Sequence, residues 1–166
     1  MKKLVMLVAV TVMSACSAWA IDYKSIIIPQ TNAPVKITSY KAEFAEGNRY
    51  VDRGIEHSVK YKNTGSKRIE AIEFGLLAFD VWNEYLDKTM GISIKANDPG
   101  DSEKGTWTSS TYASFSFLTG LAYVSKIRYS DGTIWKADTS EIKTEIMKIQ
   151  KDFDIKELDS KPPKPK

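Results

Sequence analysis

One histidine is the first residue of this chain to consider for catalysis or metal binding. His57 is the only histidine, and it lies in a stretch where Ile55, Val59 and Tyr61 alternate with polar residues. This alternation puts His57 on an apolar face and predicts a core or cross-strand histidine that makes one hydrogen bond. A zinc site normally needs further histidine or cysteine ligands, and the chain has one cysteine, so we expect none. A Ser-His-Asp triad remains formally open, but no G-x-S-x-G motif accompanies it.

Two pairs of carboxylates could in principle carry out general acid and base chemistry, as in glycosidases. The pairs are Asp80 with Glu84, and Asp98 with Asp101. Asp80 follows an apolar stretch, so we expect it to end a strand and accept hydrogen bonds from backbone N–H groups of the next turn.

A loop rich in side-chain oxygens is the candidate for calcium, which prefers such ligands. It contains Asn97, Asp98, Asp101 and Glu103. The spacing does not match an EF-hand, and Pro99-Gly100 explains the turn without a metal. We therefore predict no metal and no cofactor.

The charge of the chain gives no reason to expect a nucleic-acid partner. The formal net charge is +3, and removal of Lys2 and Lys3 would leave 22 basic against 21 acidic residues. A nearly neutral protein lacks the basic field that attracts nucleic acids. Basic residues do gather around one turn, where they predict a solvated surface or, alternatively, a site for an anionic partner. They are Lys60, Lys62, Lys67 and Arg68.

Residues 1–20 have the pattern of an export signal. Lys2 and Lys3 precede an apolar run over residues 4–13, which is too short to span a bilayer. Ala18-Trp19-Ala20 forms an A-x-A site that predicts cleavage after Ala20. Alternatively, Met13-Ser14-Ala15-Cys16 resembles a bacterial lipobox, in which Cys16 would be lipidated.

These two cleavage sites imply different locations for the protein. Cleavage after Ala20 predicts a periplasmic or secreted bacterial protein, and lipidation of Cys16 predicts an outer-membrane lipoprotein. Cys16 is the only cysteine, so neither alternative allows an internal disulfide.

The stretch over residues 69–82, IEAIEFGLLAFDVW, predicts the central strand of the domain. Ile72, Phe74 and Leu76 share one face and Leu77 and Phe79 the other, so we expect cover on both sides. A helix over residues 70–80 is the competing interpretation. The turn residues that flank the stretch favour a strand.

Shorter strands separated by turns are expected around this one. We expect a lead-in over residues 21–34 with a short edge strand before Pro29, and then a sandwich over residues 35–137. Thr119-Gly120 is expected to reverse the chain, and Asp131-Gly132 gives the strongest hairpin signal. The spacing predicts an all-β, immunoglobulin-like antiparallel sandwich of about seven strands.

An amphipathic α-helix is predicted over residues 138–159. Asp138 is the expected N-cap, with Glu141 three residues later. The stripe of the helix either packs on the sandwich or forms an exposed partner or dimer surface. It consists of Ile142, Ile146, Ile149 and Phe153. The Pro- and Lys-rich tail over residues 160–166 is expected to be disordered or extended.

Leu76-Leu77-Ala78-Phe79-Asp80 resembles the signature of FxLYD-type domains, with Leu76 in place of Phe and Ala78 in place of Leu. Asn63-Thr64-Gly65, Pro99-Gly100 and residues 124–135 are similar to the turns and closing hairpin of such domains. The resemblance covers about residues 35–135. It implies a small immunoglobulin-like sandwich of an exported protein, and it brings no catalytic residues.

Exposed aromatic rings form the last candidate site. Trp82, Tyr85 and Trp107, with Trp135, could line a platform that stacks on sugar rings, or they could pack in the core and at its rim.

The leading functional hypothesis is a non-catalytic binding or protein-interaction module of the cell envelope. Its partner would be an envelope protein or a glycan, with membrane contact only through a lipidated Cys16. A second hypothesis is a periplasmic inhibitor or immunity protein that inserts residues 97–105 into a hydrolase. A third is a carboxylate-based hydrolase.

Overall fold

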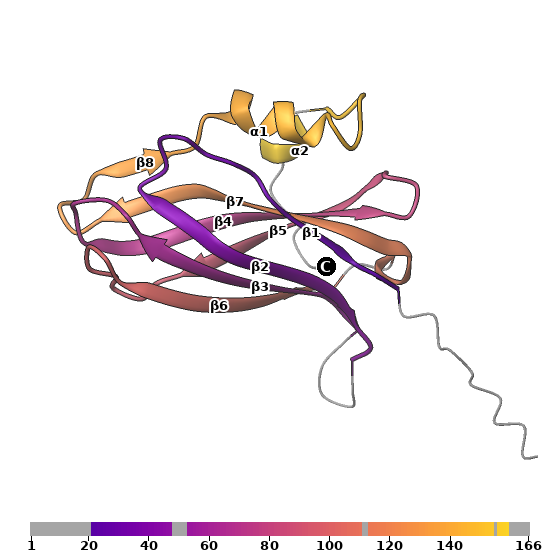
Figure 1. Ribbon diagram of the computed structural model, residues 1–166, viewed down its shortest axis with the longest axis horizontal. Helices are drawn as coiled ribbons and strands as arrows, with labels where there is room; N and C mark the ends of the chain where they lie inside the picture. Colours follow the sequence, from indigo (N-terminus) through magenta and orange to yellow (C-terminus); the bar gives the residue numbers. More distant parts are fainter. Residues whose placement is uncertain (1–20, 48–52, 111–112, 155, 160–166) are drawn as a thin grey trace, which may run out of the picture.

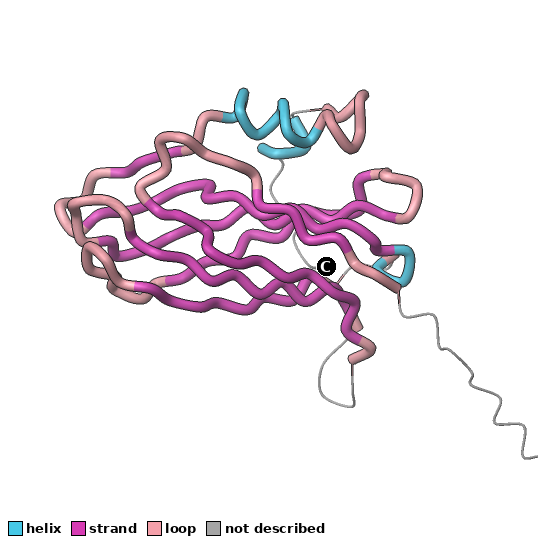
Figure 2. The backbone as a smooth tube through the Cα atoms, in the orientation of Figure 1, coloured by secondary structure: helices cyan, strands magenta, loops and turns pink. Residues whose placement is uncertain are grey.

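The protein is an all-β sandwich of two sheets with short helices near the C-terminus (Figures 1 and 2). The computed structural model describes residues 21–47, 53–110, 113–154 and 156–159. The helices lie over the outer face of one sheet, and the other sheet lies beneath it (Figure 1). The predicted fold class is confirmed.

The first sheet, called sheet A, has five strands. It runs in the order β1-β7-β4-β5, with β8 also paired to β7. β1 pairs with β7 in parallel and the other pairs are antiparallel. The strands are β1 (Lys24–Ile27), β4 (Ile69–Asp80), β5 (Tyr85–Ser93), β7 (Phe117–Tyr129) and β8 (Ile134–Lys136).

The second sheet, sheet B, has three antiparallel strands in the order β2-β3-β6. They are β2 (Val35–Ala45), β3 (Gly54–Asn63) and β6 (Ser102–Ser109). The described residues thus contain eight strands rather than about seven, because β1 and β8 both pair along the same side of β7.

β4 is covered on both faces, as its sequence predicts. Phe74 and Leu76 lie in the core between the sheets, and Leu77 and Phe79 lie in a second cluster under the C-terminal helices. All four side chains are fully buried. Gly75 allows the Tyr123 ring to lie against the strand, because a Cβ there would be 2.1 Å from that ring.

The reversal predicted at Thr119-Gly120 is wrong, since β7 runs unbroken from Phe117 to Tyr129. Gly120 has a packing role instead. A Cβ on it would lie 2.5 Å from both the Tyr40 hydroxyl and the Ala42 side chain of the opposite sheet. The glycine therefore allows the two sheets to approach closely, and the short 3-10 helix η1 (Ser114–Ser116) makes the turn before β7.

The predicted C-terminal helix is present, but its predicted length over residues 138–159 is wrong, because it ends early and a second short helix follows. The two helices are α1 (Thr139–Ile146) and α2 (Lys156–Asp159). The Asp138 cap is confirmed, since its side chain accepts a 2.8 Å hydrogen bond from the Ser140 N–H. The Gln150 side chain accepts a hydrogen bond from Tyr85 N–H, and this anchors the chain to β5 where the helix has ended.

Candidate functional site

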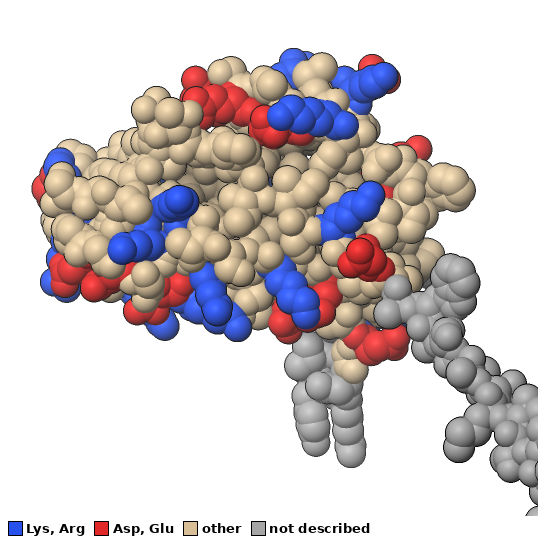
Figure 3. Space-filling view, in the orientation of Figure 1, with Lys and Arg blue, Asp and Glu red and all other residues tan. Residues whose placement is uncertain are grey.

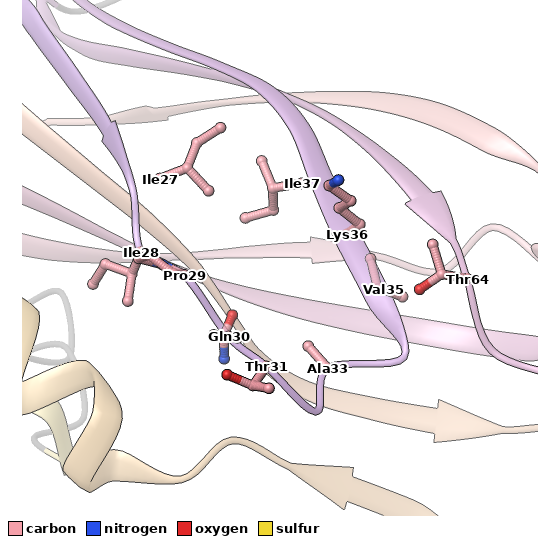
Figure 4. Close-up of a pocket in the computed structure, with 10 residues that line it drawn as sticks. All are labelled: Ile27, Ile28, Pro29, Gln30, Thr31, Ala33, Val35, Lys36, Ile37 and Thr64. Carbon is pink, nitrogen blue, oxygen red and sulfur yellow. The ribbon is translucent and has the colours of Figure 1, made fainter.

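An apolar groove lies on the side of the sandwich where β1 of sheet A faces β2 of sheet B (Figure 4). Its volume is about 440 Å³. Ile27 and Ile37 point into the space between the two strands. The loop over residues 28–34 closes one end, and Lys36 and Thr64 contribute polar groups at the rim.

Both strands beside the groove are edge strands of their sheets. β2 pairs with β3 on one side, and β1 pairs with β7 on one side. Their other sides face the groove. An edge strand carries unpaired backbone N–H and C=O groups, which another extended chain can satisfy.

The chain next to the groove is held by specific polar contacts. The Gln30 side chain takes the place of a strand residue: its oxygen accepts from Val124 N–H (2.7 Å) and its nitrogen donates to Val124 C=O (2.9 Å). Farther along, the Ser25 hydroxyl accepts a 2.8 Å hydrogen bond from the Ala42 N–H of β2. The hydrogen bond between Ser25 and Ala42 therefore joins β1 to β2 at one end of the groove. The two strands remain apart beside Ile37.

The groove lies in a largely uncharged part of the surface. The view in Figure 3 looks onto this side and shows a mostly uncharged band between the helices and the outer face of sheet B. Ile27, which lines the groove, is 36% exposed, so the groove has apolar surface that a bound segment could cover.

His57 lies in the core, as predicted, and not in a cleft. It is fully buried, and its Nδ1 shares a 2.8 Å hydrogen bond with the Tyr40 hydroxyl, while Nε2 has no partner. Burial lowers the pKa of His57 to about 4 and raises the pKa of Tyr40. The imidazole is therefore neutral near pH 7.

Asp80 has the structural role expected from its position. Its carboxylate accepts hydrogen bonds from the backbone N–H groups of Trp82 (2.8 Å) and Glu84 (2.9 Å) in the β4–β5 turn. The same turn contains Asn83, which has a positive φ of 64°. The Asp80 carboxylate therefore stabilises the turn through these hydrogen bonds.

The oxygen-rich loop over residues 97–103 is fixed by other contacts. Asp98 lies 3.4 Å from Arg68, Glu103 lies 3.4 Å from Lys95, and Asp101 accepts from the Asp98 N–H. Asp98 and Glu103 thus pair with basic residues outside the loop, and Asp101 accepts a hydrogen bond within it. Within the described ranges, no group of three or more His, Cys, Asp or Glu side chains is arranged to hold a metal ion.

The basic residues around the β3–β4 turn are partly neutralised. Lys67 pairs with Asp131 at 2.7 Å and Arg68 with Asp98, so each joins its turn to a neighbouring loop. The Lys67 ammonium also lowers the pKa of Asp131. Lys60 and Lys62 are exposed on the outer face of sheet B.

The proposed aromatic platform does not form. Trp82 is 78% exposed at the tip of the β4–β5 turn, whereas Tyr85 packs edge-on against Phe79 and Phe153. Trp107 packs on Phe74 between the sheets. The rings belong to different elements that face different directions, so they do not share a surface.

The apolar stripe of the C-terminal segment is packed on sheet A and is not an exposed partner surface. Ile142, Ile146 and Phe153 are at most 4% exposed, and Ile149 packs against the same cluster. Of the two alternatives, packing on the sandwich is therefore the one present, because Leu77 and Phe79 of β4 cover the stripe.

Three of the expectations fall on residues outside the described part of the chain. Cys16, Ala20 and the tail over residues 160–166 belong to this group. No helix in the part of the chain that the structure describes is long and apolar enough to span a membrane.

The chain was compared with family models, curated proteins and solved structures. No family model matches the chain, and no curated protein matches it. One similar solved structure is a hypothetical protein from Peptoclostridium difficile 630, with a TM-score of 0.49 and 11% identity, covering 69% of this chain and 91% of that one. Another is SoR45, a target of the Northeast Structural Genomics Consortium, with a TM-score of 0.39 and 12% identity, covering 63% and 80%.

The groove was not predicted from the sequence. Its residues come from β1, the loop after it and β2, which the sequence divides between a lead-in and the first strand of the sandwich. The run Ile26-Ile27-Ile28 was the available signal. Three consecutive isoleucines in a strand cannot all face the core, and the structure buries Ile28 while leaving Ile26 and Ile27 partly exposed.

Proposed function

We propose that the protein is a non-catalytic interaction module that binds an extended apolar segment of a partner protein in the groove between β1 and β2. The observation that carries the proposal is an apolar groove of about 440 Å³ between two edge strands, with Ile27 and Ile37 directed into it.

Strand addition explains how such a groove would recognise a partner. An extended segment beside β2 or β1 would form main-chain hydrogen bonds with the free strand edge. Its alternate side chains would then reach the apolar surface of Ile27, beside the buried Ile37 and Val35. Each backbone hydrogen bond adds about 1 kcal/mol, and burial of an aliphatic side chain adds about 2 kcal/mol.

The location of this module follows from the N-terminal pattern and is part of the proposal. The export signal over residues 1–20 supports a periplasmic or secreted protein, with an outer-membrane lipoprotein as the alternative through Cys16. The FxLYD-like residues 76–80 lie within β4, and we propose membership of that group of exported sandwich domains.

The test compares capture of envelope proteins by three forms of the protein. The wild type is immobilised beside Ile27→Arg, which places a charge in the groove, and Ile134→Arg, which places the same charge on β8 away from it. Ile134 is 58% exposed, so both substitutions start from exposed isoleucines and should preserve the fold. We expect a partner that the wild type and Ile134→Arg retain and that Ile27→Arg loses at least tenfold.

Equal retention by all three forms, or equal loss with both arginine variants, would contradict the proposal. The captured partner must also bind through one extended segment, which limited proteolysis of the bound complex would recover as a protected peptide. A folded epitope recovered instead would count against strand addition.

A further inference from the structure

A second cavity, also of about 440 Å³, lies on the outer face of sheet A beneath the C-terminal helices. Part of its wall is apolar and comes from three elements. Met90 of β5, Ile142 of α1 and Leu158 of α2 line it, and the last two side chains are at most 4% exposed. Docking of the C-terminal segment on the sheet therefore creates this wall.

The opposite wall carries a row of charges across three strands. Glu73 of β4 is the register partner of Lys126 of β7, and Lys126 is the register partner of Lys136 of β8. The Glu73 carboxylate already accepts from Lys126 (3.1 Å) and from the Ser125 hydroxyl (2.8 Å). The row thus holds one carboxylate, which pairs with Lys126, and two ammonium groups.

This row leaves an excess of positive charge in the cavity. Lys126 and Lys136 stand directly opposite each other, and like charges in such cross-strand positions destabilise a sheet. Lys88 also lines the cavity, but its ammonium donates to the Leu158 carbonyl and does not belong to this row. A bound anion beside Lys136 would reduce this repulsion.

We propose that the cavity binds an amphipathic anion. Its carboxylate, sulfonate or phosphate head would lie between Lys126 and Lys136, and its hydrocarbon part would lie along Met90, Ile142 and Leu158. The volume is within the range of about 300–1,000 Å³ that is usual for small-molecule sites. The two cavities share no lining residue, so this site does not depend on the proposed protein interaction.

Isothermal titration calorimetry with three probes tests this site. The protein is exported by an expression host and then purified. Decanoate carries both a tail and a charge, decanol carries the tail alone, and acetate carries the charge alone. We expect decanoate to bind about tenfold more tightly than either of the others, because decanol lacks the charged head and acetate lacks the hydrocarbon tail.

Substitutions at Lys136 test whether the anionic head of the ligand binds beside this residue. Lys136→Ala should weaken decanoate binding about fivefold or more and leave decanol unchanged, and Lys136→Arg should keep the affinity. Lys104→Ala, an exposed lysine on β6 of sheet B, is the matched control and should change nothing.

Equal affinities for decanoate and decanol, an unchanged affinity with Lys136→Ala, or no binding of decanoate would each overturn the proposal. Lys136 is exposed, so its substitution should not impair folding, and circular dichroism of each variant verifies this.

Discussion

The two long sides of the sandwich, where sheets A and B meet, are closed in different ways. On the β5–β6 side the Trp107 ring packs on Phe74 with ring centroids 5.5 Å apart, and its N–H donates to the Ile92 carbonyl. Glycines leave the space for this ring, since a Cβ at Gly91 or Gly105 would lie 2.8 Å or 2.2 Å from it.

On the β1–β2 side, no aromatic ring is among the described residues that line the groove. The Ala42 N–H of β2 donates to the Ser25 hydroxyl of β1, and beyond this hydrogen bond Ile27 and Ile37 line the apolar groove. The comparison indicates that one large aromatic residue with two glycines completes a sandwich side. The aliphatic side chains of β1 and β2 leave a groove of about 440 Å³.

The largest expected loss of stability comes from removing the ring that closes the β5–β6 side. Trp107→Ala removes the ring that fills the space beside Gly91 and Gly105, and we expect a loss of about 3 kcal/mol in the free energy of unfolding. Urea denaturation measures it. A loss below about 1 kcal/mol would mean that the side is closed by other contacts.

Acid should destabilise the protein through His57, the register partner of Trp107. Burial lowers the pKa of His57 from 6.5 to about 4, so between these pH values the unfolded chain binds more protons than the folded one. The free energy of unfolding should therefore fall by about 3 kcal/mol as the pH drops from about 6.5 to about 4.

The His57→Gln variant separates this effect from general acid denaturation. Its stability should depend less on pH over the same interval, as followed by urea denaturation at pH 7 and pH 4.5. An identical slope in the variant and the wild type would show that His57 is not the group responsible.

On the open side, Gln30→Ala should have an intermediate effect. The substitution removes two hydrogen bonds to the backbone of Val124 and leaves that part-buried N–H and C=O unpaired, which costs about 2 kcal/mol. Thr31→Ala, at an exposed position in the same loop, is the control and should stay within about 0.5 kcal/mol of the wild type.

Ser25→Ala should have a smaller effect, about 1 kcal/mol, because it removes one hydrogen bond at the closed part of the groove. Amide hydrogen exchange gives the more specific measurement. The Ala42 N–H should exchange faster in the variant, while the Tyr61 N–H on β3 should keep its rate. Unchanged exchange at Ala42 would mean that β1 does not protect the edge of β2.

Patterns within single strands made much of the fold predictable. The two apolar faces of β4 and the Asp131-Gly132 turn are present as expected, and Gly132 has the positive φ (81°) that this hairpin needs. The sequence wrongly predicts a turn at Gly120. A glycine is needed there because the Tyr40 hydroxyl, from a strand distant in sequence, lies against it.

The candidate sites were less predictable because they depend on contacts between distant segments. The i, i+4, i+7 pattern that predicted one long helix correctly identified buried residues, but Gln150 bonds to β5 where the helix has ended. The groove needs β1 in parallel pairing with β7, and the charge row needs β8 beside β7. The parallel β1–β7 pairing has no signal in the local sequence. Asp131-Gly132 does predict the β7–β8 hairpin, but not the cavity that forms when the C-terminal segment packs over it.

The central claim is that the open side holds an extended partner segment, and a photo-crosslinker at position 27 tests it most directly. p-Benzoylphenylalanine would replace Ile27 in one form and Ile134 in another, and cells producing each form would be irradiated. The account predicts a discrete adduct from position 27 alone, with the crosslinked peptide extended and alternating in apolar residues. Adducts of equal yield from both positions, or none from position 27, would contradict it.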